Sequence, residues 1–470
     1  MNFSRKRQIL SVVATGTFMS ALDSSVVNIA LPRMSAYFQA PLGAIEWTAL
    51  SYLLVISSLL LVYGRLGDLY GHKKIYLLGF LVFTVGSLFC GLAPTVTALV
   101  IFRGIQALGA GMLMAIGPAI ITDNVLPNER GKALSVSAVS VAVALSVGPV
   151  LGGVLTTAFG WQSIFYINLP VGICGFWWAR RALPSSETVS SKHPFDFIGA
   201  GLLFTGLISI LLPLSLVEKY GWNNGWLLAV ILAGIGILVG FGWWEQHHAD
   251  PIFDIRLFRN RLFAMSNITA LLNFIAQFTI ILLAPFYLQK LRGLSPAQAG
   301  LFMAAMPAIT MLVSPVSGSL SDRMDTRYLS SGGMAIIAFG MWMLSNLTAN
   351  SADLFIIAGL IITGFGIGLF QTPNNSAIMG SAPPSKRGVA SGMLATMRNV
   401  GMVLGVALSG ALFTSSQAWL AAQGKTEGLG GEQLAQFAFT GALHTTYAAG
   451  ASIALIGVIT SLNKGPTRSE

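Results

Sequence analysis

The stretch that decides the fold runs from Gly64 to Lys74 and reads GRLGDLYGHKK. It is a short basic segment with a single acid, and it separates two apolar runs at 43–63 and 75–93. Each run has about the 20 residues that a helix needs to cross the hydrocarbon core of a bilayer. The stretch therefore predicts a tight loop between two membrane-spanning helices, on the side of the membrane that retains Lys and Arg.

The composition of the whole chain agrees with a membrane protein. Of its 470 residues, 54% are hydrophobic and 9% are charged, whereas about 25% are charged in a typical soluble protein. This composition excludes a set of soluble domains, and it is too apolar for a disordered chain. The net charge of +10 does not indicate nucleic-acid binding, because the basic residues are scattered in short groups between apolar runs.

Fourteen apolar stretches predict an all-α integral membrane protein. The stretches are 9–31, 43–63, 75–93, 98–122, 133–156, 162–181, 196–217, 225–245, 263–288, 297–318, 329–347, 353–378, 389–414 and 441–462. Twenty of the 27 Lys and Arg residues fall in loops on one side, five fall on the other side, and Arg103 and Arg398 lie within spans. Because cytoplasmic loops are enriched in Lys and Arg, both termini are predicted to be cytoplasmic.

A repeated motif indicates two related halves. Arg130–Ala133 (RGKA) opens the fifth stretch, and Arg387–Ala390 (RGVA) opens the thirteenth, 257 residues later. At the same offset, Gly148 matches Gly405 and Gly153 matches Gly410. A second, weaker match at an offset of 254 relates Gly64 and Asp68 to Gly318 and Asp322. With 52 glycines in the chain, chance is the alternative explanation. Repeated halves are typical of transporters that bind substrate near the bilayer midplane.

The repeat predicts three parts. Residues 1–183 form a six-helix bundle, 184–250 a linker with an extra transmembrane hairpin (spans seven and eight), and 251–470 a second six-helix bundle. Residues 416–440 are expected to be an outside loop, with a short hairpin as the alternative.

Four motifs then occur in a particular order along the chain. They are Leu22–Pro32 (LDSSVVNIALP), the GxxxDxxGxKK loop at Gly64–Lys74, Arg103–Gly109 (RGIQALG) and Gly148–Gly153 (GPVLGG). Together they resemble the signature motifs of the major facilitator superfamily, and in particular its fourteen-span drug/proton antiporters. The chain departs from the pattern at Leu69, where a basic residue is usual, at His72, where Arg is common, and at Glu46, where this branch often has Gln.

The resemblance implies a function. It implies a monomeric, proton-coupled secondary transporter of the bacterial cytoplasmic (inner) membrane, which exports lipophilic, cationic small molecules by alternating access. Its partners would be the substrate, protons and membrane lipid. We expect no enzyme activity, cofactor, metal or nucleic acid, and the sequence has no GxxxxGK[ST] loop for ATP. A lipid or lysolipid flippase on the same fold, or a transport-inactive sensor or scaffold, are the alternatives.

Asp23 and Arg103 are the candidates for proton coupling. A carboxylate within a span is costly unless it is paired, hydrated or protonated, which suits a proton carrier. Arg103 retains its proton and needs an acceptor, for which Asp23, Gln106 and backbone carbonyls are available. Glu46 is the further acidic candidate, although a solvated residue at the mouth of the second span is the favoured interpretation. For Asp23 and Arg103, the alternative is a static structural pair.

The loop motif is a candidate inner gate. Its residues are Gly64, Asp68, Gly71, His72, Lys73 and Lys74, with Asp123 at the end of the fourth span. Asp68 could face the N-terminus of the eleventh or thirteenth span, where the helix dipole favours an anion. Asp123 could pair with His72 or Lys73. The alternative is a network that orders the loop without gating.

Two further groups complete the candidates. Gly148, Pro149, Gly152 and Gly153 provide a kink and a small-residue face, for either a leak-limiting contact or ordinary helix packing. Polar and aromatic residues within spans are expected to line the substrate cavity, and interhelical hydrogen bonding is the alternative role: Asn28, Asn273, Phe274, Gln277, Gln371, Asn374, Asn375 and Arg398.

Overall fold

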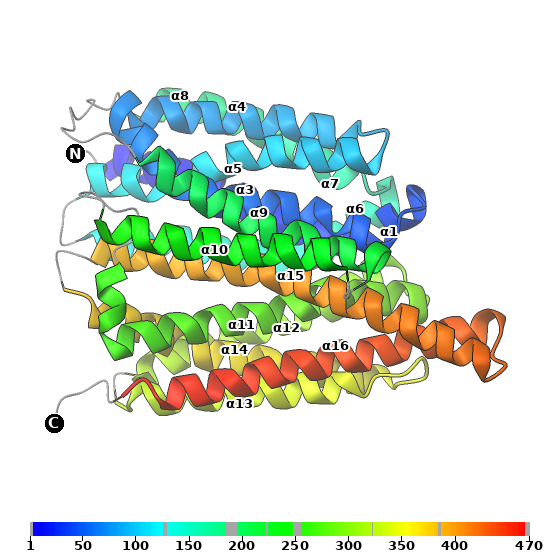
Figure 1. The fold of residues 1–470 in the computed structure, drawn as a ribbon. Helices are drawn as coiled ribbons and strands as arrows, with labels where there is room; N and C mark the ends of the chain where they lie inside the picture. The colour runs from blue at the N-terminus through cyan, green and yellow to red at the C-terminus, as the bar shows by residue number, and fades with distance from the viewer. Residues whose placement is uncertain are drawn as a thin grey trace. The chain divides into compact units, whose positions relative to one another are not determined.

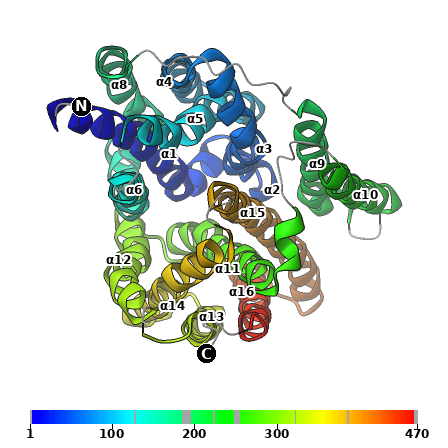
Figure 2. The ribbon, with the colours of Figure 1, turned by 90° about the vertical axis from the view of Figure 1, so that its left-hand side faces the viewer.

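The computed structural model describes residues 3–125, 129–184, 196–221, 224–247, 255–321, 323–383 and 387–465, and the secondary structure of these residues is helical throughout. Figure 1 shows the helices along their length, and Figure 2 shows them end-on. In chain order they are α1 Phe3–Tyr37, α2 Leu42–Ile45, α3 Trp47–Tyr70, α4 His72–Gly91, α5 Val96–Asn124, α6 Arg130–Phe159, α7 Ser163–Tyr166, α8 Asn168–Ala182, α9 Phe197–Tyr220, α10 Gly225–His247, η2 Ile255–Arg259, α11 Arg261–Phe286, η3 Tyr287–Leu291, α12 Pro296–Ser321, α13 Thr326–Ser345, α14 Asp353–Ser381, α15 Arg387–Thr426 and α16 Gly431–Leu462.

Among the described residues, 12 helices are long and apolar enough to cross a membrane. The other two predicted spans also contain helices, but α8 has 15 residues, and the apolar part of α9, Ile198–Leu214, is shorter than the length required. The chain is therefore a multi-pass, all-helical membrane protein. The count of fourteen spans and the cytoplasmic termini stay predictions.

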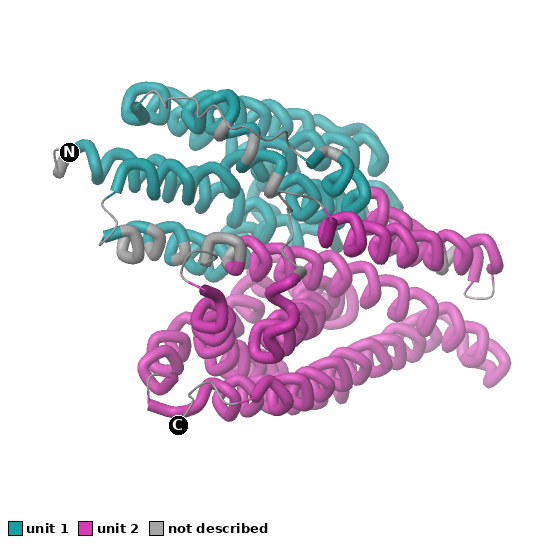
Figure 3. The backbone as a smooth tube through the Cα atoms, turned by 60° about the vertical axis from the view of Figure 1, so that its left-hand side comes forward, with its two compact units in different colours: residues 1–40, 47–204 teal, residues 41–46, 205–470 magenta. Residues whose placement is uncertain are grey.

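The helices divide into two compact units (Figure 3). Unit 1 comprises residues 1–40 and 47–204, and unit 2 comprises residues 41–46 and 205–470. The boundary between the units falls within α9, whereas α10 belongs to unit 2. The predicted division at 183 and 250 into bundle, hairpin and bundle stays a prediction.

In unit 1, α4 and α5 touch along their backbones. A Cβ atom at Gly109 would collide with the Phe83 amide nitrogen and stand 2.6 Å from the Gly79 carbonyl oxygen. A Cβ at Gly86 would stand 2.8 Å from the Gln106 amide nitrogen. Such close approach is possible because small residues let helix backbones meet. This packing lets side chains next to the contact, such as Ser87 of α4 and Gln106 of α5, reach each other.

Unit 2 repeats this packing between α13 and α14. Gly333 approaches the Gly366 carbonyl, and Gly340 approaches Thr363. The spacings match those of the sequence motifs: Gly333 and Gly340 follow Gly79 and Gly86 by 254 residues, and Gly366 and Thr363 follow Gly109 and Gln106 by 257. The repeat is therefore present in the packing as well as in the sequence, which argues against chance.

The segment 416–440 is not a loop. Helix α15 continues to Thr426 and α16 begins at Gly431, so the segment is a helical hairpin with a short turn. Gly428 adopts a φ of 82° in this turn, a conformation that glycine reaches without strain. The Ala, Gln and Leu residues on both sides of the turn are good helix formers, which explains why the helices extend.

Lys464, which follows the last helix, is buried at one end of unit 2. It is 1% exposed, and its Nζ donates a hydrogen bond to Ser330 Oγ over 3.0 Å. Burial lowers the pKa of Lys464 from its ordinary 10.5 to about 8, although the nearby Asp325 opposes this shift. The folded protein therefore releases this proton at a pH where the unfolded chain still holds it.

We expect Lys464→Met to remove a pH dependence of stability. Between about pH 8 and 10.5 the unfolded chain binds more protons at this residue, so the wild-type free energy of unfolding rises with pH through that window. The size of the rise is up to about 3 kcal/mol. Thermal unfolding from pH 7 to 10.5 should show Lys464→Met more stable than wild type at pH 7 and flatter above pH 8. The exposed Lys425→Met is the control, and equal slopes for all three proteins would contradict the assignment.

Candidate functional site

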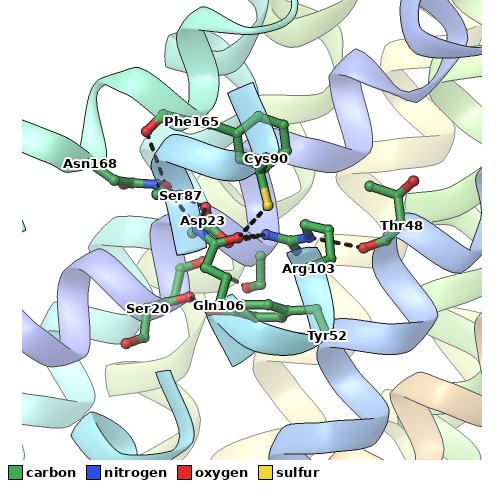
Figure 4. A network of polar contacts seen from close by, with 12 residues as sticks. Ser20, Asp23, Thr48, Tyr52, Ser87, Cys90, Arg103, Gln106, Phe165 and Asn168 are labelled. Carbon is green, nitrogen blue, oxygen red and sulfur yellow. Dashed lines mark hydrogen bonds and ion pairs between the residues drawn. The ribbon is translucent and has the colours of Figure 1, made fainter. Parts of the chain in front are cut away.

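Asp23, on α1, lies at the centre of a network of polar side chains in unit 1 (Figure 4). It is completely buried. Its Oδ2 accepts a hydrogen bond from Arg103 Nη1, with which it forms an ion pair. Its Oδ1 accepts bonds from Gln106 Nε2 at 2.9 Å and Asn168 Nδ2 at 2.8 Å. The carboxylate is thus held from α5 and α8 together.

Arg103, on α5, is also completely buried and has several partners. Its Nε donates to the Thr48 carbonyl oxygen over 2.9 Å, and its Nη1 donates to Gln106 Oε1 over 2.7 Å as well as to Asp23. The guanidinium carbon lies 4.1 Å from the centre of the Tyr52 ring, at cation–π distance. Backbone, amide, carboxylate and ring therefore fix the guanidinium in one place.

Ser87 and Asn168 close the network. Gln106 Nε2 and Asn168 Nδ2 both donate to Ser87 Oγ, at 2.9 and 3.0 Å, and this hydroxyl donates onward to the Phe165 carbonyl oxygen at 3.1 Å. Each amide nitrogen therefore uses one hydrogen on Asp23 and one on Ser87. The Cys90 thiol also donates to Gln106 Oε1, at 3.6 Å. Satisfied networks of this kind hold a buried charge in a unique arrangement.

Local sequence places these side chains. Thr95 caps the start of α5 by accepting a hydrogen bond from the Ala98 amide, and Arg103 and Gln106 follow on the same helix at i and i+3. The contact at Gly86 brings α4 against the backbone of Gln106, so that the next residue, Ser87, reaches the Gln106 amide. The network is therefore a product of the α4–α5 packing described above.

The energetics of this pair do not resemble those of a surface salt bridge. Removing two charges from water costs several kcal/mol per ion, and their mutual attraction repays this only with good geometry and further hydrogen bonds. Breaking such a pair by removing one partner costs about 3–5 kcal/mol.

The corresponding places in unit 2 carry no charge. Leu360 lies three residues before Thr363, as Arg103 lies three before Gln106. Ser25 packs on Gly148, and Phe278 packs on Gly405, the repeat partner of Gly148. Two residues before each lie Asp23 and Ala276. The duplicated packing therefore carries an ion pair in one unit and apolar side chains in the other.

The sequence predicted the centre of this network but not its edge. Asp23 and Arg103 meet, and all three acceptors proposed for Arg103 are used: Asp23, Gln106 and a backbone carbonyl. The sequence did not indicate Ser87, Asn168 or Tyr52. A polar Asn168 directly before Leu-Pro in an apolar stretch was a signal that could have been followed.

Glu46 is buried, so the interpretation as a solvated residue is wrong. It follows the short helix α2, which groups with unit 2. Its carboxylate lies directly against Gly410 of α15, where any side chain larger than hydrogen would collide with it. Because α2 packs on α15, Glu46 is buried although it lies at the end of a short helix. Its role in proton coupling stays a prediction.

The predicted loop at Gly64–Lys74 is mostly helical: α3 continues to Tyr70 and α4 begins at His72, so Gly71 alone forms the turn between them. Gly71 adopts a φ of 92°, which favours glycine. His72 Nδ1 lies 2.7 Å from Asp123 Oδ2, which confirms one of the two predicted pairings, and Lys73 Nζ donates instead to the Leu183 carbonyl oxygen over 2.5 Å. Lys74 is exposed, and nothing approaches a Cβ placed at Gly64. The Asp68 side chain lies outside the described residues.

The GPVLGG motif packs α6 against α1. A Cβ at Gly148 would collide with Ser25, and one at Gly152 would stand 2.9 Å from the Val26 carbonyl oxygen. Pro149 and Gly153 are buried in the same stretch. The motif therefore contacts the Leu22–Pro32 motif that contains Asp23, as helix packing requires, and its role in limiting leak stays a prediction.

The predicted cavity residues lie in different environments. Asn28 donates to the Ser24 carbonyl oxygen of its own helix over 2.8 Å, and Phe274 packs on Gly401. Asn374 donates to the Ser266 carbonyl oxygen over 3.0 Å, whereas its neighbour Asn375 is exposed. The remaining four are buried or partly buried side chains of unit 2: Asn273, Gln277, Gln371 and Arg398. Their part in binding substrate stays a prediction.

Comparisons with known proteins agree with this architecture. The sequence profile of the Major Facilitator Superfamily matches residues 13–244 and 197–406. The chain is 35% identical to the riboflavin transporter RibZ of Clostridioides difficile, over 87% of this chain and 88% of that protein. It is 31% identical to multidrug resistance protein 3 of Bacillus subtilis, over 85% of this chain and 78% of that protein.

Solved transporter structures share the fold. A bacterial homologue of the human lysosomal transporter Spinster, in an inward-facing and occupied conformation, is 16% identical and gives a TM-score of 0.68, over 99% of this chain and 97% of that one. The peptide transporter POT in complex with sulfate is 13% identical with a TM-score of 0.70, over 97% and 94% of the two chains. The chain belongs to the major facilitator superfamily and is a membrane transporter of small molecules, not an enzyme.

Proposed function

We propose that this chain is a proton-coupled exporter of small molecules that works by alternating access in the bacterial cytoplasmic membrane, with Asp23 as the proton carrier. The observation that carries the proposal is the completely buried Asp23–Arg103 ion pair, which the polar groups of α4, α5 and α8 surround. The proposal includes fourteen spans, cytoplasmic termini and a monomeric protein.

The contacts of Asp23 suggest how a proton would act. The carboxylate accepts three hydrogen bonds, from Arg103, Gln106 and Asn168. Protonation removes the attraction to Arg103, while Arg103 keeps the Thr48 carbonyl and Gln106 as acceptors. The guanidinium is then held by neutral groups alone, which weakens the contact between α1 and α5.

The energies are compatible with coupling. A tenfold change in the equilibrium between two conformations corresponds to about 1.4 kcal/mol. A gradient of one pH unit supplies the same amount per proton. Modest movement of Arg103 away from Asp23 would therefore be enough to couple proton release to the conformational cycle.

The cargo is proposed only by class. The resemblance of the motifs predicts lipophilic cations, and several relatives are named multidrug resistance proteins, while another is named a riboflavin transporter. These names support small aromatic molecules as the class to be tested first.

The test uses purified protein in liposomes with an imposed pH gradient. Ethidium, a lipophilic cation, and riboflavin, an uncharged polar heterocycle, are the two probes. We expect the protein to accumulate at least one of them only when the gradient is present, and a protonophore to abolish the accumulation. Uptake that is equal with and without the gradient, for every probe transported, would refute proton coupling.

A further inference from the structure

Helices α11, α14 and α15 of unit 2 place polar groups without hydrogen-bond partners at a similar level along their axes. Gly401 of α15 approaches the Leu271 carbonyl of α11, and Gly405 approaches the Ile275 carbonyl, so the two helices run side by side with a constant offset of 130 residues. This register places Arg398 of α15 beside residue 268 of α11. On α14, Asn374 bonds to the Ser266 carbonyl, which places it at the same level.

Arg398 faces α11. It precedes Gly401 and Gly405 by three and seven residues, and these positions share one face of a helix. On α11, Asn267 precedes Leu271 and Phe274 by four and seven residues, so it lies on the face that packs against α15. Arg398 and Asn267 are therefore placed on the facing sides of α15 and α11, and Asn267 Nδ2 donates to the Phe263 carbonyl oxygen of its own helix over 2.9 Å.

Arg398 has no counter-charge there. Its Nε is buried without a hydrogen-bond partner, and the structure gives it no ion pair with any residue that it describes. The described residues of α11 and α15 contain no Asp or Glu, and the acid of α14, Asp353, is its first residue. Glu46 meets α15 at Gly410, which is 12 residues or about 18 Å along the helix from Arg398.

The polar groups at the level of Arg398 on α11, α14 and α15 are neutral and also contain atoms without partners. They are side-chain atoms of residues that are at most 5% exposed: Ser266 Oγ, Asn267 Oδ1, Asn374 Oδ1 and Asn399 Nδ2. One to three turns further along α11, both amide atoms of the buried Asn273 and the Oε1 of Gln277 are unpaired too. Buried polar groups are normally hydrogen-bonded, so unpaired donors and acceptors at the level of a cation favour a polar ligand there.

We propose that Arg398 binds a carboxylate or a similar anionic group of the transported substrate, while the amides of α11 and α14 bind polar groups on the rest of that molecule. This inference rests on the proposed transport function, and it names a different substrate class from the lipophilic cations that the motifs predict. A lipophilic cation would meet a positive charge at Arg398 without a carboxylate to offset it. The cargo class that these residues fit is therefore a small, polar molecule with an anionic group.

The first test is the stability of the protein without ligand. Without ligand, the buried charge of Arg398 has no counter-charge to offset the cost of its desolvation. Arg398→Met is therefore expected to raise the midpoint of thermal unfolding by about 2 °C or more. Arg323→Met removes the same charge from an exposed position and is the matched control, expected to be neutral. A lower midpoint for Arg398→Met would show that Arg398 already has a structural partner and would overturn the proposal.

The second test is selectivity between two dyes that differ in one group. Rhodamine 110 has a free carboxylate, and rhodamine 123 is its methyl ester. Fluorescence polarisation with purified protein in nanodiscs should show the carboxylate dye binding about 10-fold more tightly to wild type and to Arg323→Met, the strength of a charged hydrogen bond. Arg398→Met should bind both dyes equally.

Tighter binding of the ester, or a preference that survives in Arg398→Met, would overturn the inference. If neither dye binds, the stability comparison decides alone. Both measurements are made at equilibrium without a proton gradient, so they do not depend on Asp23. Failure of coupling in the liposome test would leave this inference standing, and failure here would leave proton coupling standing.

Discussion

Asp23→Asn is expected to reduce transport against a concentration gradient to background, while exchange down a gradient continues. The amide cannot gain or lose a proton, so the variant represents the permanently neutral form of the carrier. It also leaves Arg103 with only the Thr48 carbonyl and neutral side-chain groups as acceptors. The measurement is proton release from proteoliposomes on addition of substrate, compared between the variant and wild type.

Stability has to be separated from coupling in this experiment. Removing one partner of a buried pair costs about 3–5 kcal/mol, so Asp23→Asn alone can misfold. The double variant Asp23→Asn with Arg103→Gln removes both charges and is expected to recover stability without recovering proton release. Asp353→Asn is the control, because this exposed acid forms a surface ion pair with Arg292 at 2.8 Å. If Asp23→Asn still exchanges protons for substrate, Asp23 is not the carrier, and Glu46 and Asp123 become the next candidates.

Gly109→Ala is expected to destabilise unit 1 more than any other Gly→Ala substitution on α5. Its Cβ would collide with the Phe83 amide nitrogen and crowd the Gly79 carbonyl, and neither backbone atom can move without separating α4 from α5. Overpacking of this kind costs about 1–3 kcal/mol, and more where backbone is struck. Separation of the helices would also withdraw Ser87 from Gln106 and loosen the network around Asp23.

Gly104 offers a matched control on the same helix. No atom lies within 4 Å of a Cβ built there, so Gly104→Ala is expected to be neutral or stabilising by up to about 1 kcal/mol, because Ala favours helix over Gly. Thermal unfolding of the two variants in the same detergent compares them directly. Equal midpoints for Gly109→Ala and Gly104→Ala would show that the α4–α5 contact is not tight.

The sequence predicted the fold because its signals are local. A span is recognised by about 20 consecutive apolar residues. The GxxxDxxGxKK motif likewise lies within 11 positions, Gly64–Lys74. Asp23 and Arg103 were found in the same way, since each is a charge within an apolar stretch. Their pairing could be proposed because an Arg within a span must find an acceptor.

The parts that the sequence missed depend on packing between distant segments. In the sequence, Ser87 and Asn168 are ordinary polar residues. The contact at Gly86 brings Ser87 to Gln106, and the start of α8 brings Asn168 to Asp23. Glu46 was misinterpreted because nothing in its neighbourhood along the chain reveals that Gly410 lies against it. The hairpin at 416–440 was only the alternative prediction because its glycines suggested a loop, whereas the turn needs only the residues between Thr426 and Gly431.

The unequal halves of this chain have an evolutionary consequence. Unit 2 keeps the glycine packing of unit 1 but has Ala276 and Leu360 where unit 1 has Asp23 and Arg103. On the proposed assignment, a duplicated half without the ion pair can accumulate substitutions without disturbing how the transporter is energised. Selection for a new cargo would then change α11, α14 and α15, while the charged residues of unit 1 are inherited unaltered. A duplicated fold with the charge in one half only thus separates the adaptation of specificity from the supply of energy.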